Sequence, residues 1–256
     1  MIAPETGSPD CWYSDASLRA PESIIEFGQT LIVAPHPDDE VLGCGGVIAL
    51  LRQAGIPVRI IIASDGAASH PGSKAYPPDA LAALRRRESV DGLALLGVTP
   101  EHIRFLGLPD GAVPSADDPM GRDAVEAGRA AVLSWPGVET VLLPWRRDPH
   151  GDHRATWSLF KAALEMLPAP VRRVEYPIWS RVNPGPDDVP VEGEARVWRL
   201  DISPVQTRKR AAILAHRSQT TALIDDAQNA ECLTADVLDL FFQPFEPLLE
   251  VVGVRT

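Results

Sequence analysis

The sequence predicts an α/β protein in which helices cover both faces of a Rossmann-like, mostly parallel sheet. Two observations lead to this fold class. Short apolar runs rich in Ile, Val and Leu alternate along the chain with longer segments whose apolar residues recur every three or four positions. The chain has 256 residues, of which 45% are hydrophobic, so it can bury a full core as one domain.

The first half of the chain contains three expected strands and two expected helices. The apolar run at residues 30–35 predicts a buried strand. A helix over 41–54 follows, because apolar residues recur along it, three acids precede it and a glycine ends it. The isoleucine-rich residues 58–63 predict the next strand. Helical spacing then covers 78–96, and a third strand is expected over 102–106.

The second half continues the same alternation. A helix over 123–134 leads to a fourth strand over 138–144, an apolar run that ends at a proline. A helix over 153–166 and a strand over 172–176 complete the alternating part. Strands that alternate with helices in this way imply parallel pairing through right-handed crossovers.

The pattern weakens in the last third of the chain. We expect a single domain with its core over residues 29–180 and a C-terminal extension over 181–256 that shapes the rim of a site or contacts between subunits. Within the extension, residues 196–202 are typical of an edge strand, whereas 204–216 and 237–245 are expected to be helical.

Two clusters of polar residues follow the first and the fourth expected strands. In the common strand order 3-2-1-4-5 these two strands are neighbours, and ligands bind beyond their carboxyl ends. The clusters should therefore face each other across one crevice. They read His36-Pro37-Asp38-Asp39-Glu40 and Asp148-Pro149-His150-Gly151-Asp152-His153.

These residue types suit a hydrolytic metal centre. His36, Asp39 and His153 offer two imidazoles and a carboxylate, a set that leaves a coordination position open for water or substrate. Zinc and ferrous iron both suit such ligands. Asp38 is the natural base, since a second carboxylate beside an ion can accept a proton from the attacking water. The alternative is that each cluster is a solvated turn, because Asp and Pro are common in ordinary loops.

Dinucleotide binding is the competing use of this fold. Gly43, Gly45 and Gly46 resemble a glycine fingerprint, but they lie one turn inside the expected helix, and the preceding loop carries three acids that would repel a pyrophosphate. We therefore expect no nucleotide cofactor. The glycines are better explained by close packing of the helix on the sheet.

Both clusters resemble the signature motifs of the PIG-L or LmbE-like zinc-dependent N-deacetylases. The family signature is His-Pro-Asp-Asp-Glu after the first strand and His-Pro-Asp-His after a later one, and Gly151 here stands where the second motif usually has proline. Weaker matches include residues 105–111 and 216–219, so the similarity spans roughly 29–219.

The resemblance implies metal-assisted removal of an acetyl group from an N-acetylglucosamine-type conjugate, with Zn²⁺ as the cofactor and Fe²⁺ as an alternative. It implies that Asp38 is the general base. It also implies that a protonated His150 stabilises the oxyanion and that Asp152 holds the His150 ring. The implied metal ligands are His36, Asp39 and His153.

Substrate contacts are expected from three places. Arg85 is a sugar-binding arginine by resemblance, but Arg85 could equally belong to a solvated helix face. The loop after the second strand offers Asp65 and Ser69. Trp145 and Arg146 could provide a stacking face and an anion contact, although a single Trp at a strand end is as often part of the core.

Charge and cysteine content bear on partners and compartment. The net charge of -11 argues against nucleic acid and anionic membranes as partners and leaves a small molecule. Three widely separated cysteines fit a reduced, cytoplasmic compartment, and the polar amino terminus lacks the features of a secretory signal. By family analogy we expect a homo-oligomer. Two other functions stay open: an amidase acting on a non-sugar amide, and a non-catalytic metal- or sugar-binding module.

Overall fold

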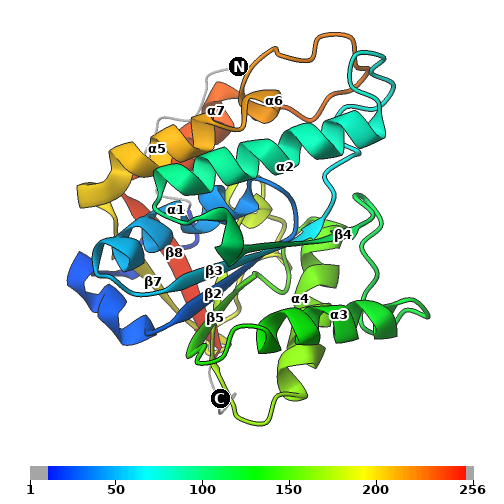
Figure 1. Ribbon diagram of the computed structural model, residues 1–256. Helices are drawn as coiled ribbons and strands as arrows, with labels where there is room; N and C mark the ends of the chain where they lie inside the picture. The colour runs from blue at the N-terminus through cyan, green and yellow to red at the C-terminus, as the bar shows by residue number, and fades with distance from the viewer. Residues whose placement is uncertain (1–10, 252–256) are drawn as a thin grey trace.

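A single eight-stranded sheet runs through the computed structural model, which describes residues 11–251 (Figure 1). The order across the sheet is β1-β7-β8-β6-β5-β2-β3-β4. The block β4-β3-β2-β5-β6 is parallel throughout, which confirms the predicted order 3-2-1-4-5. The strands are β1 (Ser17–Arg19), β2 (Thr30–Ala34), β3 (Val58–Ser64), β4 (Ile103–Leu108), β5 (Thr140–Pro144), β6 (Arg172–Tyr176), β7 (Ala195–Asp201) and β8 (Phe245–Val251).

Helices cover both faces of the sheet, as the fold class predicted (Figure 1). One face carries α1 (Asp39–Gln53), α2 (Pro78–Leu95), α5 (Gln206–Leu214), α6 (Arg217–Thr220) and α7 (Ala235–Phe241), and the other carries α3 (Gly121–Leu133) and α4 (Gly151–Glu165). Alternate strand residues feed two cores, with Ile32 on the α1 face and Leu31 on the α4 face. Of the helices that the structure describes, none is both long enough and apolar enough to cross a membrane.

The C-terminal extension departs from the sequence prediction in two ways. The segment expected to be helical over 237–245 contains α7 only to Phe241, and β8 begins at Phe245 as a strand antiparallel to β6 and β7. Phe245–Val251 includes two glutamates and a proline, so it lacks the continuous apolar run that would predict a buried strand. In addition, β7 is not an edge strand, because β1 pairs with its outer side.

The glycines of α1 allow the helix to lie directly on its neighbours, as the sequence predicted. A Cβ atom on Gly43 would lie 2.3 Å from the ring of Tyr176, and one on Gly46 would lie 2.4 Å from Ile202. No larger residue fits at either position without displacing its neighbour. This close approach fixes α1, and with it the His36–Asp39 loop that precedes the helix.

A buried ion pair anchors the C-terminal extension to α1. The Glu246 carboxylate on β8 accepts hydrogen bonds from the backbone N–H groups of Gly46 (2.7 Å) and Val47 (2.8 Å). The same carboxylate lies 2.7 Å from Nζ of Lys209, and both side chains are almost completely buried. Three polar groups therefore depend on one carboxylate.

Replacing Glu246 with glutamine should lower the free energy of unfolding by about 3–5 kcal/mol, because the substitution leaves the Lys209 ammonium buried without a counter-charge. Urea denaturation measures the change. Glu250→Gln on the same strand is the matched control, since Glu250 pairs with Arg172 at 2.6 Å where both side chains are partly exposed. Its expected cost is about 0–1 kcal/mol. Equal costs for the two substitutions would contradict this account of the anchor.

Candidate metal centre

The two polar clusters meet at the carboxyl ends of β2 and β5, which are neighbouring parallel strands. The His36–Asp39 loop follows β2 and opens α1, and the residues from Asp148 to His153 follow β5 and open α4. Residues from both clusters line a cavity of about 380 Å³. The cavity is lined by His36, Asp38, Asp39, Leu42, Ser69, Arg85, Asp110, His150, Trp179, Gln219, Glu231, Cys232 and Leu233.

The three predicted metal ligands lie together in the structure. Oδ2 of Asp39 is 3.1 Å from Nδ1 of His36 and 3.2 Å from Nε2 of His153. All three residues are buried, and each offers one ligand atom within 4.8 Å of the others. Side chains separated by more than 100 residues in sequence thus converge on one carboxylate oxygen.

Each of the two imidazoles has a carboxylate at its outer nitrogen, the one directed away from Asp39. Nε2 of His36 lies 3.1 Å from Oδ2 of Asp152 and 3.3 Å from Oδ1 of Asp110. Nδ1 of His153 lies 3.4 Å from Oδ1 of Asp148. These carboxylates favour a proton on the outer nitrogen of each ring and leave the lone pair of the inner nitrogen directed at Asp39, as metal-binding histidines require.

The electrostatics of this cluster fit a divalent cation. Nε2 of His153 is buried without a hydrogen-bond partner. Although burial opposes a charged ring, the carboxylates of Asp39 and Asp148 raise the pKa of His153 to about 9, so the surroundings favour positive charge.

A second possible ligand set shares His36 with the first. It consists of His36, His150 and Asp152. Both carboxylate oxygens of Asp152 already accept backbone hydrogen bonds, from Gly111 (2.7 Å) and Val113 (3.1 Å). Nδ1 of His150 accepts another, from the amide of Asp152 (3.1 Å). The geometry therefore favours the set that contains Asp39 and His153.

Replacing Asp148 with asparagine should weaken metal binding about 10–100-fold, because His153 would lose the carboxylate that orients its ring. Competition against a calibrated chelator measures the affinity. Asp148 also accepts the backbone N–H groups of Ile178 and Trp179, so thermal melting of the metal-free variant must accompany the titration. Unchanged affinity in a folded variant would show that Asp148 does not act through His153.

Asp38 occupies a strained backbone position beside the proposed ligands. Its φ of 130° is rare for a residue other than glycine and costs about 1–3 kcal/mol. Contacts around the loop hold this conformation: the Asp38 amide donates to Oε2 of Glu40 (2.9 Å), and its carbonyl accepts the N–H of Leu42 (2.9 Å). Burial raises the pKa of the Asp38 carboxyl to about 7, although the Arg85 guanidinium opposes the shift. Such a carboxyl can exchange a proton near neutral pH.

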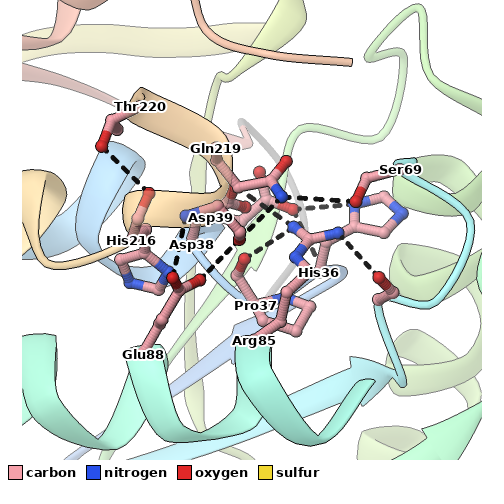
Figure 2. Close-up of polar contacts among 12 residues, drawn as sticks. His36, Pro37, Asp38, Asp39, Ser69, Arg85, Glu88, His216, Gln219 and Thr220 are labelled. Atoms are coloured by element: carbon pink, nitrogen blue, oxygen red, sulfur yellow. Dashed lines mark hydrogen bonds and ion pairs between the residues drawn. The ribbon is translucent and has the colours of Figure 1, made fainter. Parts of the chain in front are cut away.

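Arg85 on α2 is buried in the cavity wall, so it does not belong to a solvated helix face. Figure 2 shows its guanidinium reaching toward the loop of Pro37 and Asp38. It donates to the carbonyls of Gly66 (3.1 Å) and Pro37 (2.8 Å) and to Oδ2 of Asp38 (3.2 Å). Arg85 therefore holds the loop in place, and its contact with a substrate stays a prediction.

The Asp152 carboxylate was expected to hold the His150 ring, but in the structure it makes other contacts. The carboxylate turns to His36 and to the backbone of residues 111–113, while the Asp152 amide donates to Nδ1 of His150. Burial lowers the pKa of His150, and the neighbouring His153 and His36 lower it further, which disfavours the protonated ring that the resemblance implied. Asp152 orients His36 instead.

The predicted substrate contacts separate into two groups. Ser69 lines the cavity, as Arg85 does. Asp65 lies outside the lining and accepts the amide N–H of Ala67 (3.0 Å). Trp145 is fully buried and donates to the Asp188 carbonyl (2.7 Å), and Arg146 pairs with Glu175 (3.0 Å). These positions give no support to substrate contacts by Asp65, Trp145 or Arg146.

For several other residues of the site, the sequence alone does not indicate a role. Oε2 of Glu88 on α2 accepts the hydroxyl of Ser218 at 2.6 Å, and Gln219 donates to Oγ of Ser69 at 3.3 Å (Figure 2). This network ties α6 to the loop after β3. The motif at residues 216–219 is visible in the sequence, but its partner on α2 lies 130 positions away. Asp110, which contacts His36, was likewise given no role.

Comparison with known proteins gives a consistent result. The family model described as PIG-L, GlcNAc-PI de-N-acetylase, matches residues 31–164, which include both polar clusters. A Bacillus cereus protein named "Probable N-acetyl-alpha-D-glucosaminyl L-malate deacetylase 2" is 30% identical over 198 residues, covering 77% of this chain and 86% of that protein. The 2'-N-acetylparomamine deacetylase of Streptomyces fradiae is 29% identical over 62% of this chain and 60% of its own length.

A solved structure supports the same fold. The N,N'-diacetylchitobiose deacetylase from Pyrococcus horikoshii superposes with a TM-score of 0.58 and 24% sequence identity, over 81% of this chain and 72% of that one. At this identity the likeness concerns the fold.

Proposed function

The chain belongs to the PIG-L family of de-N-acetylases, and from this premise we propose that it removes the acetyl group from a small N-acetylated amino-sugar conjugate of the N-acetylglucosamine type with the help of a divalent metal ion. The observation that carries the proposal is the position of Asp38. A buried carboxyl with a pKa near 7 borders the same cavity as the three proposed ligands. A module that only bound metal or sugar would have no need of such a base.

His36, Asp39 and His153 would hold the ion. When bound, a divalent ion would polarise the acetamide carbonyl and lower the pKa of water. Asp38 would accept the proton of the attacking water and return it to the leaving amine. Arg85 would keep Asp38 in its strained position through the two hydrogen bonds that it makes to residues 37–38.

His150 would stabilise the developing oxyanion. Because Nδ1 of His150 accepts the Asp152 amide, the ring proton belongs on Nε2, and a neutral imidazole can donate that proton as a hydrogen bond. The ring lines the cavity, and its centroid lies 4.8 Å from that of His36. This proposal keeps the role that the resemblance implies and drops the need for a charged ring.

We also propose Zn²⁺ as the cofactor, with Fe²⁺ as the alternative that two imidazoles and one carboxylate equally suit. We further propose that the chain is a single domain whose extension over 181–256 shapes the site, since Gln219, Glu231, Cys232 and Leu233 line the cavity. A homo-oligomeric state, a cytoplasmic location and the absence of nucleic-acid or membrane partners stay predictions, as does the alternative of a non-sugar amide substrate.

Acetate release from a panel of N-acetylated amino sugars tests the proposed function. The metal-loaded protein should release acetate and free amine in equal amounts, treatment with a chelator should stop the release, and added Zn²⁺ or Fe²⁺ should restore it. Turnover that a chelator leaves unchanged would contradict the proposal, and so would the absence of acetate with either metal while non-sugar amides are cleaved.

A further inference from the structure

Residues 231–233 belong to the cavity lining and end a segment, residues 225–233, that packs against the loop after β3. The Glu231 amide donates to the Ser69 carbonyl (2.9 Å), and the Leu233 amide donates to the Gln219 carbonyl (2.8 Å). Farther along, the Asp226 carboxylate accepts the hydroxyl of Ser73 (2.6 Å). The segment is therefore fastened to the loop after β3 and to α6, and these contacts place Glu231, Cys232 and Leu233 in the cavity lining.

The charges in the cavity lining are unbalanced. Four carboxylates belong to it, whereas Arg85 is its one Lys or Arg within residues 11–251. The Arg85 guanidinium is already engaged by Gly66, Pro37 and Asp38. An anionic group on a bound molecule would thus find no free guanidinium or ammonium among the lining residues. The four carboxylates are Asp38, Asp39, Asp110 and Glu231.

Glu231 differs from the other three carboxylates. Asp38 pairs with Arg85, and Asp39 and Asp110 face the ring of His36. The Glu231 side chain is exposed and forms no ion pair with any residue that the structure describes. It therefore adds to the cavity lining a negative charge that no Lys or Arg side chain of the described residues pairs with, on a segment distinct from the proposed metal ligands.

We infer that Glu231 is a specificity-determining residue that selects conjugates whose aglycone, the group attached to the amino sugar, carries an amine, and disfavours aglycones that carry carboxylate or phosphate. The inference rests on the proposed function. The acetamide must reach the proposed metal ligands, so the aglycone is left for the rest of the cavity, whose lining includes Glu231, Trp179 and Leu233. An ammonium there gains attraction from Glu231, and an anion meets a like charge with no free Lys or Arg side chain among the lining residues to offset it.

The test compares kcat/KM for acetate release by the metal-loaded protein on three N-acetylglucosaminides. Their aglycones are an aminocyclitol, a neutral polyol and a dicarboxylic acid. At low ionic strength the amine-bearing substrate should exceed the acidic one by about tenfold or more, and the ratio should shrink as salt screens the charges. Glu231→Gln should lower the ratio by about 3–10-fold, and Glu231→Lys should lower it further.

Asp225→Asn is the matched control. Asp225 is exposed on the same segment but lies outside the cavity lining, so the loss of its charge should leave the ratio unchanged. A native preference for the acidic aglycone, or an identical ratio in Glu231→Gln, would overturn the role of Glu231 while leaving deacetylation intact. No acetate from any of the three substrates would instead overturn the proposed function, and the inference with it.

Discussion

Replacing Asp38 with asparagine is expected to lower kcat for acetate release by about 10²–10⁴-fold, the usual contribution of a general base. Asparagine has the same size and cannot accept the proton of the attacking water at neutral pH. Asp38 is not one of the three proposed metal ligands, so the variant should bind as much metal as the native protein. Steady-state kinetics and elemental analysis of the same preparation measure both quantities.

Two controls show whether a loss of activity comes from the Asp38 carboxylate itself. Asp239→Asn removes the same charge from an exposed position on α7 and should leave kcat at the native value. The substitution does not change the backbone, which has a φ of 130° at residue 38, so the backbone strain is the same in both proteins. The melting temperature of the Asp38→Asn variant should therefore stay close to that of the native protein. Full turnover by a folded, metal-loaded Asp38→Asn variant would remove Asp38 from the mechanism.

Replacing His153 with glutamine should have the other large effect: metal content should fall from roughly one ion per chain to nearly none, and acetate release should fall with it. The substitution leaves the ion with only His36 and Asp39 from the protein, too few for the three protein ligands that catalytic zinc sites keep. The loss of affinity should exceed the change of about 10–100-fold expected for Asp148→Asn, because His153 would contact the ion directly.

His102→Gln is the control for this experiment. His102 lies in the turn before β4, away from the cavity lining, and its replacement should change neither metal content nor rate. If His153→Gln kept a full equivalent of metal and native activity, the ion would have to bind elsewhere, and the set of His36, His150 and Asp152 would be the next candidate.

The central fold was predictable because its signals are local. Apolar runs such as residues 30–35 and the helical spacing of 41–54 are readable within a short window, and the rules for parallel strands then predict the order. β8 was not predicted, because Phe245–Val251 includes two glutamates and a proline and so gives no clear periodic signal; only Phe245 was wrongly placed in a helix. β1 has three residues, too few for any periodicity.

The proposed ligands were predictable for a similar reason, since each lies within a short motif placed directly after a strand. Contacts between residues that are far apart in the sequence were not predictable. The Asp152 carboxylate reaches His36 across 116 positions, and Glu231 reaches the cavity only because residues 225–233 fold back onto the loop after β3. Trp145 is fully buried and donates to the carbonyl of Asp188, 43 positions away, so the sequence around the strand end could not distinguish a core residue from a stacking platform.

The most direct test of the metal centre is an anomalous-scattering measurement on crystals grown with Zn²⁺. We predict one strong peak at about 2.0–2.2 Å from Nδ1 of His36, Oδ2 of Asp39 and Nε2 of His153. A peak elsewhere, or three side chains that point away from one another with no metal density between them, would contradict it.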